Sequence, residues 1–157
     1  MNQPVLSIDI SKSHSFAAAY YSYEKIYHKP VKFNHTPQGI KPLINWLEDL
    51  ENKTNTKPQV AMEATGNFSK PIKDFFMKKG YEVVELNPIM TQRQKRKSIR
   101  KVKTDPVDTQ RIAKVYYLND VKPKEIDPQY VTEIRNLTRQ YEGLNVLYRE
   151  TQLRYRS

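Results

Sequence analysis

The order of the apolar segments constrains the fold of this chain more than any other feature. Three strand-like segments, residues 5–15, 16–23 and 25–33, follow one another with short breaks. Consecutive strands joined by short connections predict an antiparallel meander. After them, Thr36-Pro37 suits the cap and first position of a helix, and Pro42 predicts a later start. The apolar residues that recur there at helical spacing are Ile40, Leu43, Ile44, Leu47 and Leu50.

From residue 59 onward, strand-like and helix-like segments alternate. Residues 59–64 form a short apolar run, and residues 81–86 form another. The segment between them has apolar residues at helical spacing and reaches a glycine cap at Gly80. Such a succession predicts a right-handed parallel crossover. A meander followed by alternating helices and strands predicts an α/β fold, a ribonuclease-H-like mixed sheet with flanking helices.

The second half of the sequence predicts a domain boundary. A basic segment follows Asn87-Pro88, a helix is expected from near Asp105-Pro106, and prolines punctuate residues 121–128. We therefore expect a globular domain over residues 1–120, a linker over 121–128 and a helical segment over 129–157. In that last segment, residues spaced alternately by four and three are typical of a coiled coil and of a homo-oligomer: Tyr130, Ile134, Leu137, Tyr141, Leu144, Tyr148, Thr151 and Tyr155. An amphipathic helix packed on its own domain explains the same spacing.

Composition narrows the possible partners and metal sites. Lysine and arginine outnumber aspartate and glutamate by 27 to 17, and the net charge of +10 favours a polyanion such as DNA or RNA. The chain has no cysteine, which excludes disulfides and thiolate zinc sites, so a metal would need carboxylate or histidine ligands. No apolar stretch approaches the length of a membrane helix and no signal-peptide pattern is present, so a cytoplasmic location is expected.

Four acidic residues are candidates for one metal site. Asp9 interrupts an apolar strand in SIDIS, where a carboxylate is costly without a cation or donors. Glu63 ends an apolar run in MEATG, where an exposed glutamate would be ordinary. Asp105 and Asp108, in KTDPVDTQRIA, also suit a helix cap and the helix dipole. Together the four can converge, and such oxygen ligands select Mg²⁺ or Mn²⁺ for phosphodiester chemistry.

A basic segment, TQRQKRKSIRKVK at residues 91–103, immediately precedes the aspartate pair. It is either a solvated loop or a surface that binds the phosphates of a nucleic acid, and its position beside the carboxylates favours phosphate contact. The residues predicted to bind nucleic acid are Arg93, Lys95, Arg96, Lys97, Arg100, Lys101 and Lys103.

The three acidic motifs, SIDISK, MEATG and KTDPVDTQRIA, resemble those of the DEDD transposases of the insertion sequence one-hundred-ten family, with which the Piv-type DNA invertases are grouped. The resemblance runs from residue 5 to about residue 118. It implies a RuvC-like catalytic domain in which Asp9, Glu63, Asp105 and Asp108 bind magnesium, followed by a coiled coil and a domain bearing a catalytic serine. It also implies DNA strand cleavage and exchange in transposition, guided by a bridge RNA.

Because the sequence stops at Ser157, within the expected coiled coil, we expect it to lack the serine domain and to be catalytically incomplete alone. Two alternatives are a stand-alone RuvC-like nuclease or resolvase and a non-catalytic nucleic-acid-binding module. Sugar kinases and actin-like ATPases also begin with a strand and an aspartate. They need a glycine-bearing phosphate loop next, and residues 10–14 contain no glycine.

Overall fold

A computed structural model describes residues 3–12, 14–64, 68–97, 105–118 and 129–156, with the backbone alone for residues 93–97, 105, 106, 129, 130, 132 and 156. Its contacts divide the chain into two units, Met1–Lys124 and Glu125–Ser157. The linker expected over residues 121–128 lies outside the described residues.

The first unit is built on a mixed sheet of five strands in the order β3-β2-β1-β4-β5. β1 (Val5–Ile10), β2 (Ser15–Ser22) and β3 (Lys25–Phe33) form the expected antiparallel meander. β4 (Gln59–Glu63) and β5 (Val83–Leu86) extend it in parallel. β1 ends five residues earlier than predicted, and just beyond its end the Ser11 hydroxyl donates to the His14 carbonyl.

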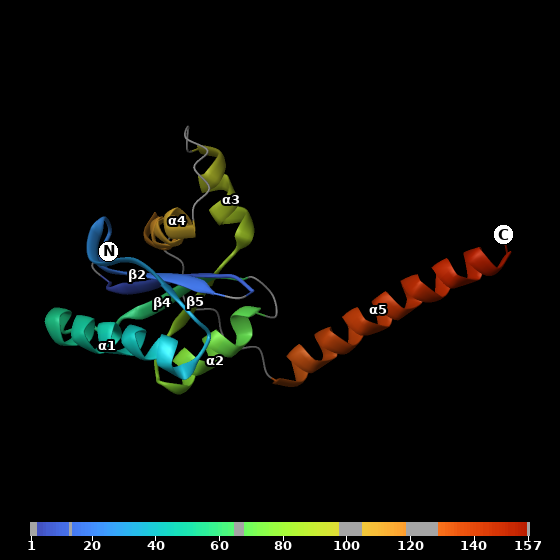
Figure 1. Cartoon of the computed structure of the whole chain (residues 1–157), viewed down its shortest axis with the longest axis horizontal. Helices are drawn as coiled ribbons and strands as arrows, with labels where there is room; N and C mark the ends of the chain where they lie inside the picture. The colour runs from blue at the N-terminus through green and yellow to red at the C-terminus, as the bar shows by residue number, and fades with distance from the viewer. Residues whose placement is uncertain (1–2, 13, 65–67, 98–104, 119–128, 157) are drawn as a thin grey trace. The chain divides into compact units, whose positions relative to one another are not determined.

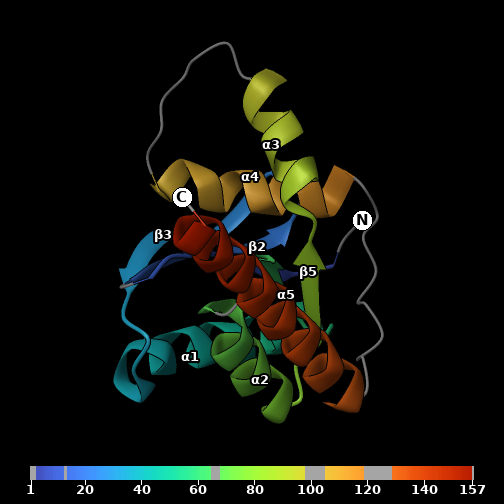
Figure 2. The same ribbon diagram turned by 90° about the vertical axis from the view of Figure 1, so that its right-hand side faces the viewer.

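Two helices cover one face of the sheet, as Figures 1 and 2 both show. α1 (Pro37–Thr54) begins where Thr36 accepts a hydrogen bond from the Gly39 amide, at 3.1 Å. The prediction that Pro42 delays this helix is wrong, because the cap and the buried Ile40 hold the first turn in place. α2 (Ser69–Lys78) ends just before Gly80, whose φ of 83° suits glycine. Both helices pack on apolar residues of β1, β2 and β4.

The opposite face is covered by α4 (Asp105–Leu118), which packs against β1 and β2 and also contacts α3 (Pro88–Lys97) (Figure 2). α3 was not predicted as a helix. Asn87 starts it by accepting from the Ile89 amide at 2.9 Å, and the buried Thr91 donates to the Pro88 carbonyl at 2.9 Å. The many basic residues leave too few apolar positions for a helical period to be recognised from sequence.

The second unit is a single helix, α5 (Gln129–Arg156). The predicted seam therefore runs along one uninterrupted helix, and those of its apolar side chains that the structure describes are more than half exposed, from 58% at Ile134 to 94% at Tyr155. None of the helices in the described part of the chain is long and apolar enough to cross a membrane.

Candidate active site

Asp9 and Glu63 occupy neighbouring positions on two central parallel strands. The register of β1 with β4 pairs Ile8 with Met62, so the next residues on the two strands stand side by side at their carboxyl ends. Ile8 and Met62 both belong to the core under α1 and α2. Because side chains alternate along a strand, Asp9 and Glu63 face the other side of the sheet, which α4 covers. Both are half-buried.

Two tyrosine hydroxyls show the direction in which α4 crosses this face. Tyr116 donates to the Gln59 side-chain oxygen at 2.6 Å, and Tyr117 donates to the Gln3 carbonyl at 2.8 Å. Gln59 begins β4, and Gln3 directly precedes β1. The carboxyl end of α4 therefore lies where these strands begin, and its amino end points toward their carboxyl ends.

The lengths of helix and strand place Asp108 level with Glu63. Eight residues of helix separate Tyr116 from Asp108, or about 12 Å at 1.5 Å per residue. Four residues of strand separate Gln59 from Glu63, or about 13 Å at 3.3 Å per residue. Since Tyr116 is joined to Gln59, the opposite ends of these two segments come to the same height on the sheet.

Asp108 itself is well buried and paired with a basic side chain. Its side chain is 14% exposed, and it forms an ion pair with Arg111, one turn later on α4 and equally buried. The neighbouring Thr109 is fully buried against the sheet. Asp105 begins α4 on the same side of the helix as Asp108, and its side chain lies outside the described residues.

The four predicted metal ligands are thus only partly brought together. Asp9 and Glu63 are lateral neighbours, whereas Asp108 is turned to Arg111. Among the described side chains, no three histidines, aspartates or glutamates lie close enough to hold a metal ion. The tetrad therefore remains a prediction.

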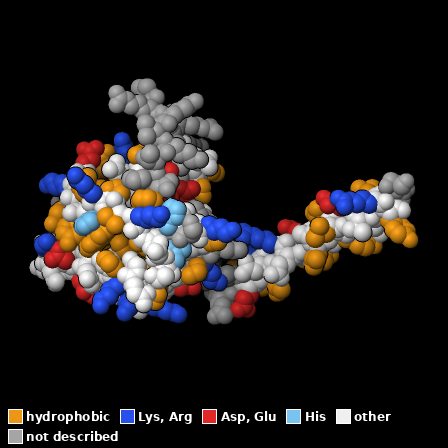
Figure 3. Space-filling view, in the orientation of Figure 1, with side chains coloured by type: hydrophobic (Ala, Val, Ile, Leu, Met, Phe, Trp, Pro, Cys, Tyr) orange, Lys and Arg blue, Asp and Glu red, His pale blue; other side chains and the backbone are white. Residues whose placement is uncertain are grey.

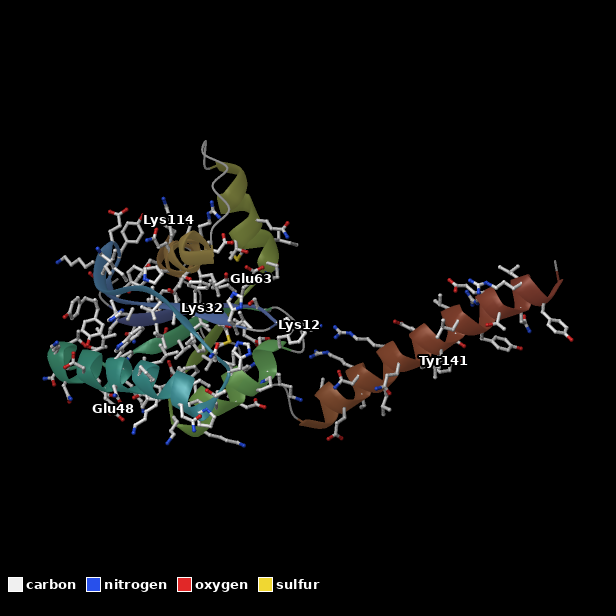
Figure 4. All side chains as sticks on the ribbon, in the orientation of Figure 1. Lys12, Lys32, Glu48, Glu63, Lys114 and Tyr141 are labelled. Atoms are coloured by element: carbon white, nitrogen blue, oxygen red, sulfur yellow. The ribbon has the colours of Figure 1, made fainter. Side chains whose placement is uncertain are left out.

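Lys32 lies in line with Asp9 across the sheet, and the sequence did not identify it as a site residue. Phe16 pairs with Asp9 on one side and with Lys32 on the other, so Lys32 lies two strands from Asp9, roughly 10 Å across the sheet. Figure 4 labels Lys32, Lys12 and Glu63, and Figure 3 shows lysine, arginine and histidine side chains on this part of the surface. The pairing of β2 with β3 is regular at Lys32 and irregular beyond Ala17, so only the register shows that Lys32 aligns with Asp9.

A serine and a histidine meet on the opposite face of the sheet from Asp9. The oxygen of the buried Ser15 lies 2.7 Å from Nε2 of His35. Burial, and to a lesser extent His14, lowers the pKa of His35. The contact between Ser15 and His35 joins the end of β3 to the start of β2, which is a structural role.

The basic segment falls largely outside the described side chains. α3 includes four of the predicted residues, for which the structure describes only the backbone: Arg93, Lys95, Arg96 and Lys97. The other three lie outside the described residues: Arg100, Lys101 and Lys103. α3 contacts α4, so the basic helix adjoins the helix that carries Asp105 and Asp108. Contact between this segment and phosphates remains a prediction.

The architecture is similar to that of RuvC from Thermus thermophilus. The matching solved structures include one of RuvC (TM-score 0.48) and one of T. thermophilus RuvC in complex with Holliday junction substrate (TM-score 0.50). Both are 12% identical and cover 78% of this chain and 100% or 99% of the other. The second likeness supports the RuvC-like, ribonuclease-H-like fold predicted from the order of segments.

Sequence comparison identifies the family directly. No curated protein matches the sequence. The family model of the DEDD transposases of the insertion sequence one-hundred-ten (IS110) type, described as "Transposase", matches residues 6–157. That match spans the sheet, both helical layers and α5, and it contains all three acidic motifs. The chain therefore belongs to the DEDD transposase family of IS110-type insertion sequences.

Proposed function

We propose that this chain is the catalytic domain of a DNA transposase that cleaves and exchanges DNA strands with Mg²⁺ or Mn²⁺ held by Asp9, Glu63, Asp105 and Asp108. The observation that carries the proposal is the parallel register that puts Asp9 beside Glu63, under the amino-terminal half of α4. Membership of a transposase family supports DNA strand cleavage as the reaction at this site.

The residues present fit a divalent cation. Two half-buried carboxylates on adjacent strands, about 5 Å apart at their backbones, repel each other and favour a cation between them. Carboxylate oxygens are also the ligands that Mg²⁺ and Mn²⁺ prefer. Bound there, such ions would polarise the scissile phosphate and activate the attacking oxygen.

The chain's own residues would divide the remaining work. Asp9 and Glu63, on rigid strands, hold the cation at a fixed place. Asp108 must leave Arg111 to join them, and the freed guanidinium is then available for a phosphate oxygen. Lys32 and the basic segment, residues 91–103, bind the DNA backbone, which the carboxylates alone would repel.

The partners follow from charge and exposure. The net charge of +10 suits DNA, and one of the matched RuvC structures contains a DNA junction. A bridge RNA is expected from the family resemblance. The exposed seam of α5 supports a homo-oligomer formed by pairing with the same helix of a second copy.

Metal binding by matched variants tests the proposal. Calorimetric titration of the chain with MnCl₂ should show binding at millimolar or lower concentration, and Asp9→Asn or Glu63→Gln should abolish it. Asp74→Asn is the control, because Asp74 is an exposed residue of α2, on the other face of the sheet. Equal manganese binding by Asp9→Asn and the unmodified chain would remove Asp9 from the site.

A stand-alone nuclease or resolvase is the second candidate, because the likeness spans almost the whole of RuvC. The products of DNA incubated with the chain and Mg²⁺ separate the two. Hydrolysed ends support the nuclease, whereas a transposase domain that is catalytically incomplete alone should give no joined strands. If the chain is a non-catalytic binding module, it should bind no metal. Its DNA binding should also be unchanged when all four acidic residues are replaced.

A further inference from the structure

The ion pair between Asp108 and Arg111 is unusually buried for two charged side chains one turn apart on a helix. Each side chain is only 14% exposed, so both charges have lost most of their contact with water. Removing two charges from water often costs about as much as their attraction returns. The pair therefore contributes little to the stability of the fold, and its place at the candidate active site is better explained by function.

Most of the hydrogen-bond donors of Arg111 are unused among the described residues. A guanidinium carries five N–H donors, and this one donates through Nη1 to a single carboxylate oxygen of Asp108. In the part of the chain that the structure describes, Arg111 shows no other hydrogen bond or ion pair. Because the guanidinium fork matches the oxygens of a phosphate, its remaining donors suit a second, phosphate-like anion.

The direction of the Arg111 side chain brings its guanidinium toward the carboxylates. Long side chains on a helix point back toward its amino end, and Arg111 does so when it reaches Asp108. The amino end of α4 points toward the carboxyl ends of β1 and β4, where Asp9 and Glu63 stand side by side. The guanidinium therefore borders the proposed metal site.

We propose that Arg111 couples metal binding to DNA binding, an inference that rests on the proposed function. Without a metal ion, Arg111 pairs with Asp108, which offsets its charge and withholds it from DNA. When Asp108 binds a divalent cation, its ion pair with Arg111 weakens, because the two positive charges repel each other across the shared carboxylate. Arg111 then donates to a phosphate of the DNA strand.

Such a coupling acts in both directions. If the metal raises the affinity for DNA, then DNA raises the affinity for the metal by the same factor. Arg111 thus keeps DNA binding at the active site weak without metal, and keeps metal binding weak before DNA arrives. A hydrogen bond between charged groups of this kind changes affinity by about tenfold.

Calorimetric titration of the 157-residue chain with MnCl₂, without DNA, tests the first half of the inference. Arg111→Gln should bind manganese about three- to tenfold more tightly than the unmodified chain, because the competing charge is gone. Lys114→Gln is the matched control: it removes the same charge from an exposed position on α4 (Figure 4) and should leave manganese affinity unchanged. A purely structural Arg111 predicts unchanged or weaker binding by Arg111→Gln, and that result would overturn the inference.

Fluorescence anisotropy with a labelled DNA duplex in EDTA tests the second half. Asp108→Asn releases Arg111 without metal, so it should raise DNA affinity about tenfold. Adding Arg111→Gln should remove that gain, whereas adding Lys114→Gln should leave most of it. Equal losses from the two additions would assign the gain to net charge and refute the coupling. The double variant leaves no unpaired charge at this buried position, so it answers the question even if Arg111→Gln alone unfolds.

The outcomes separate this inference from the proposed function. Manganese binding that requires Asp9, together with no gain in DNA affinity for Asp108→Asn, would overturn the role of Arg111 and leave the metal site intact. Absence of manganese binding by the unmodified chain would overturn both. Tighter manganese binding by Arg111→Gln, with a gain in DNA affinity that depends on Arg111, would support the coupling.

Discussion

Replacing Tyr20 by phenylalanine should stabilise the fold of this protein. The change removes only the hydroxyl, which is buried and has no hydrogen-bond partner among the described residues, while the ring keeps its place in the core under α4. An unsatisfied buried polar group costs about 1–3 kcal/mol. We expect a gain of about 1 kcal/mol in the free energy of unfolding, or roughly 2–4 °C in Tm for a chain of this size.

The same variant should change the response to alkaline pH. Burial raises the pKa of Tyr20 from 10.0 to about 12. Above pH 10 the unfolded chain releases this proton while the folded chain keeps it, so stability falls with rising pH until the folded group also ionises. Two pKa units correspond to about 2–3 kcal/mol, lost between pH 10 and pH 12. The Tyr20→Phe variant should not show this part of the loss of stability at alkaline pH.

Urea unfolding followed by circular dichroism at pH 7, 10 and 11.5 measures both effects. Tyr27→Phe is the matched control. It removes a 2.6 Å hydrogen bond to Asp49, so it should lower stability at pH 7. A Tyr20→Phe variant that is less stable than the unmodified chain at pH 7, or equally sensitive to alkali, would show that the hydroxyl is satisfied in solution.

Three further predictions concern other parts of the first unit. Gly39→Ala should destabilise the chain by more than about 1 kcal/mol in urea unfolding, because an added Cβ would lie 2.4 Å from the Asn34 carbonyl oxygen; a neutral result would mean that this segment shifts freely. Lys32→Ala should lower the salt slope of DNA affinity by about one unit, measured by fluorescence anisotropy, and an unchanged slope would exclude a phosphate contact. The lowered pKa of His35 means that the unfolded chain takes up this proton first as pH falls below about 6.5, so stability should decrease there. His35→Gln should reduce that decrease in unfolding curves from pH 7 to pH 5, and an identical decrease in the variant would assign it to other groups.

Local sequence determined the meander, the parallel crossover and the order of helices and strands along the chain. The reason is that apolar periodicity, Thr36 as a helix cap and Gly80 as a stop are properties of a few neighbouring residues. β1 ended five residues earlier than predicted, where the Ser11 hydroxyl donates to the His14 carbonyl instead of continuing the strand. α3 was missed because its basic residues carry almost no apolar period.

The acidic motifs could be recognised as a set, but their arrangement is a product of tertiary structure. Only the register of β1 with β4 puts Asp9 beside Glu63, and only the bonds of two tyrosines to the strand starts decide which end of α4 lies over them. The alignment of Lys32 with Asp9 across the sheet likewise depends on strand register. The lack of a hydrogen-bond partner for the Tyr20 hydroxyl, among the described residues, also depends on packing between distant segments. Periodicity reports which face of a segment is buried, whereas register, helix direction and the pairing of buried polar groups are set by packing, which no local pattern encodes.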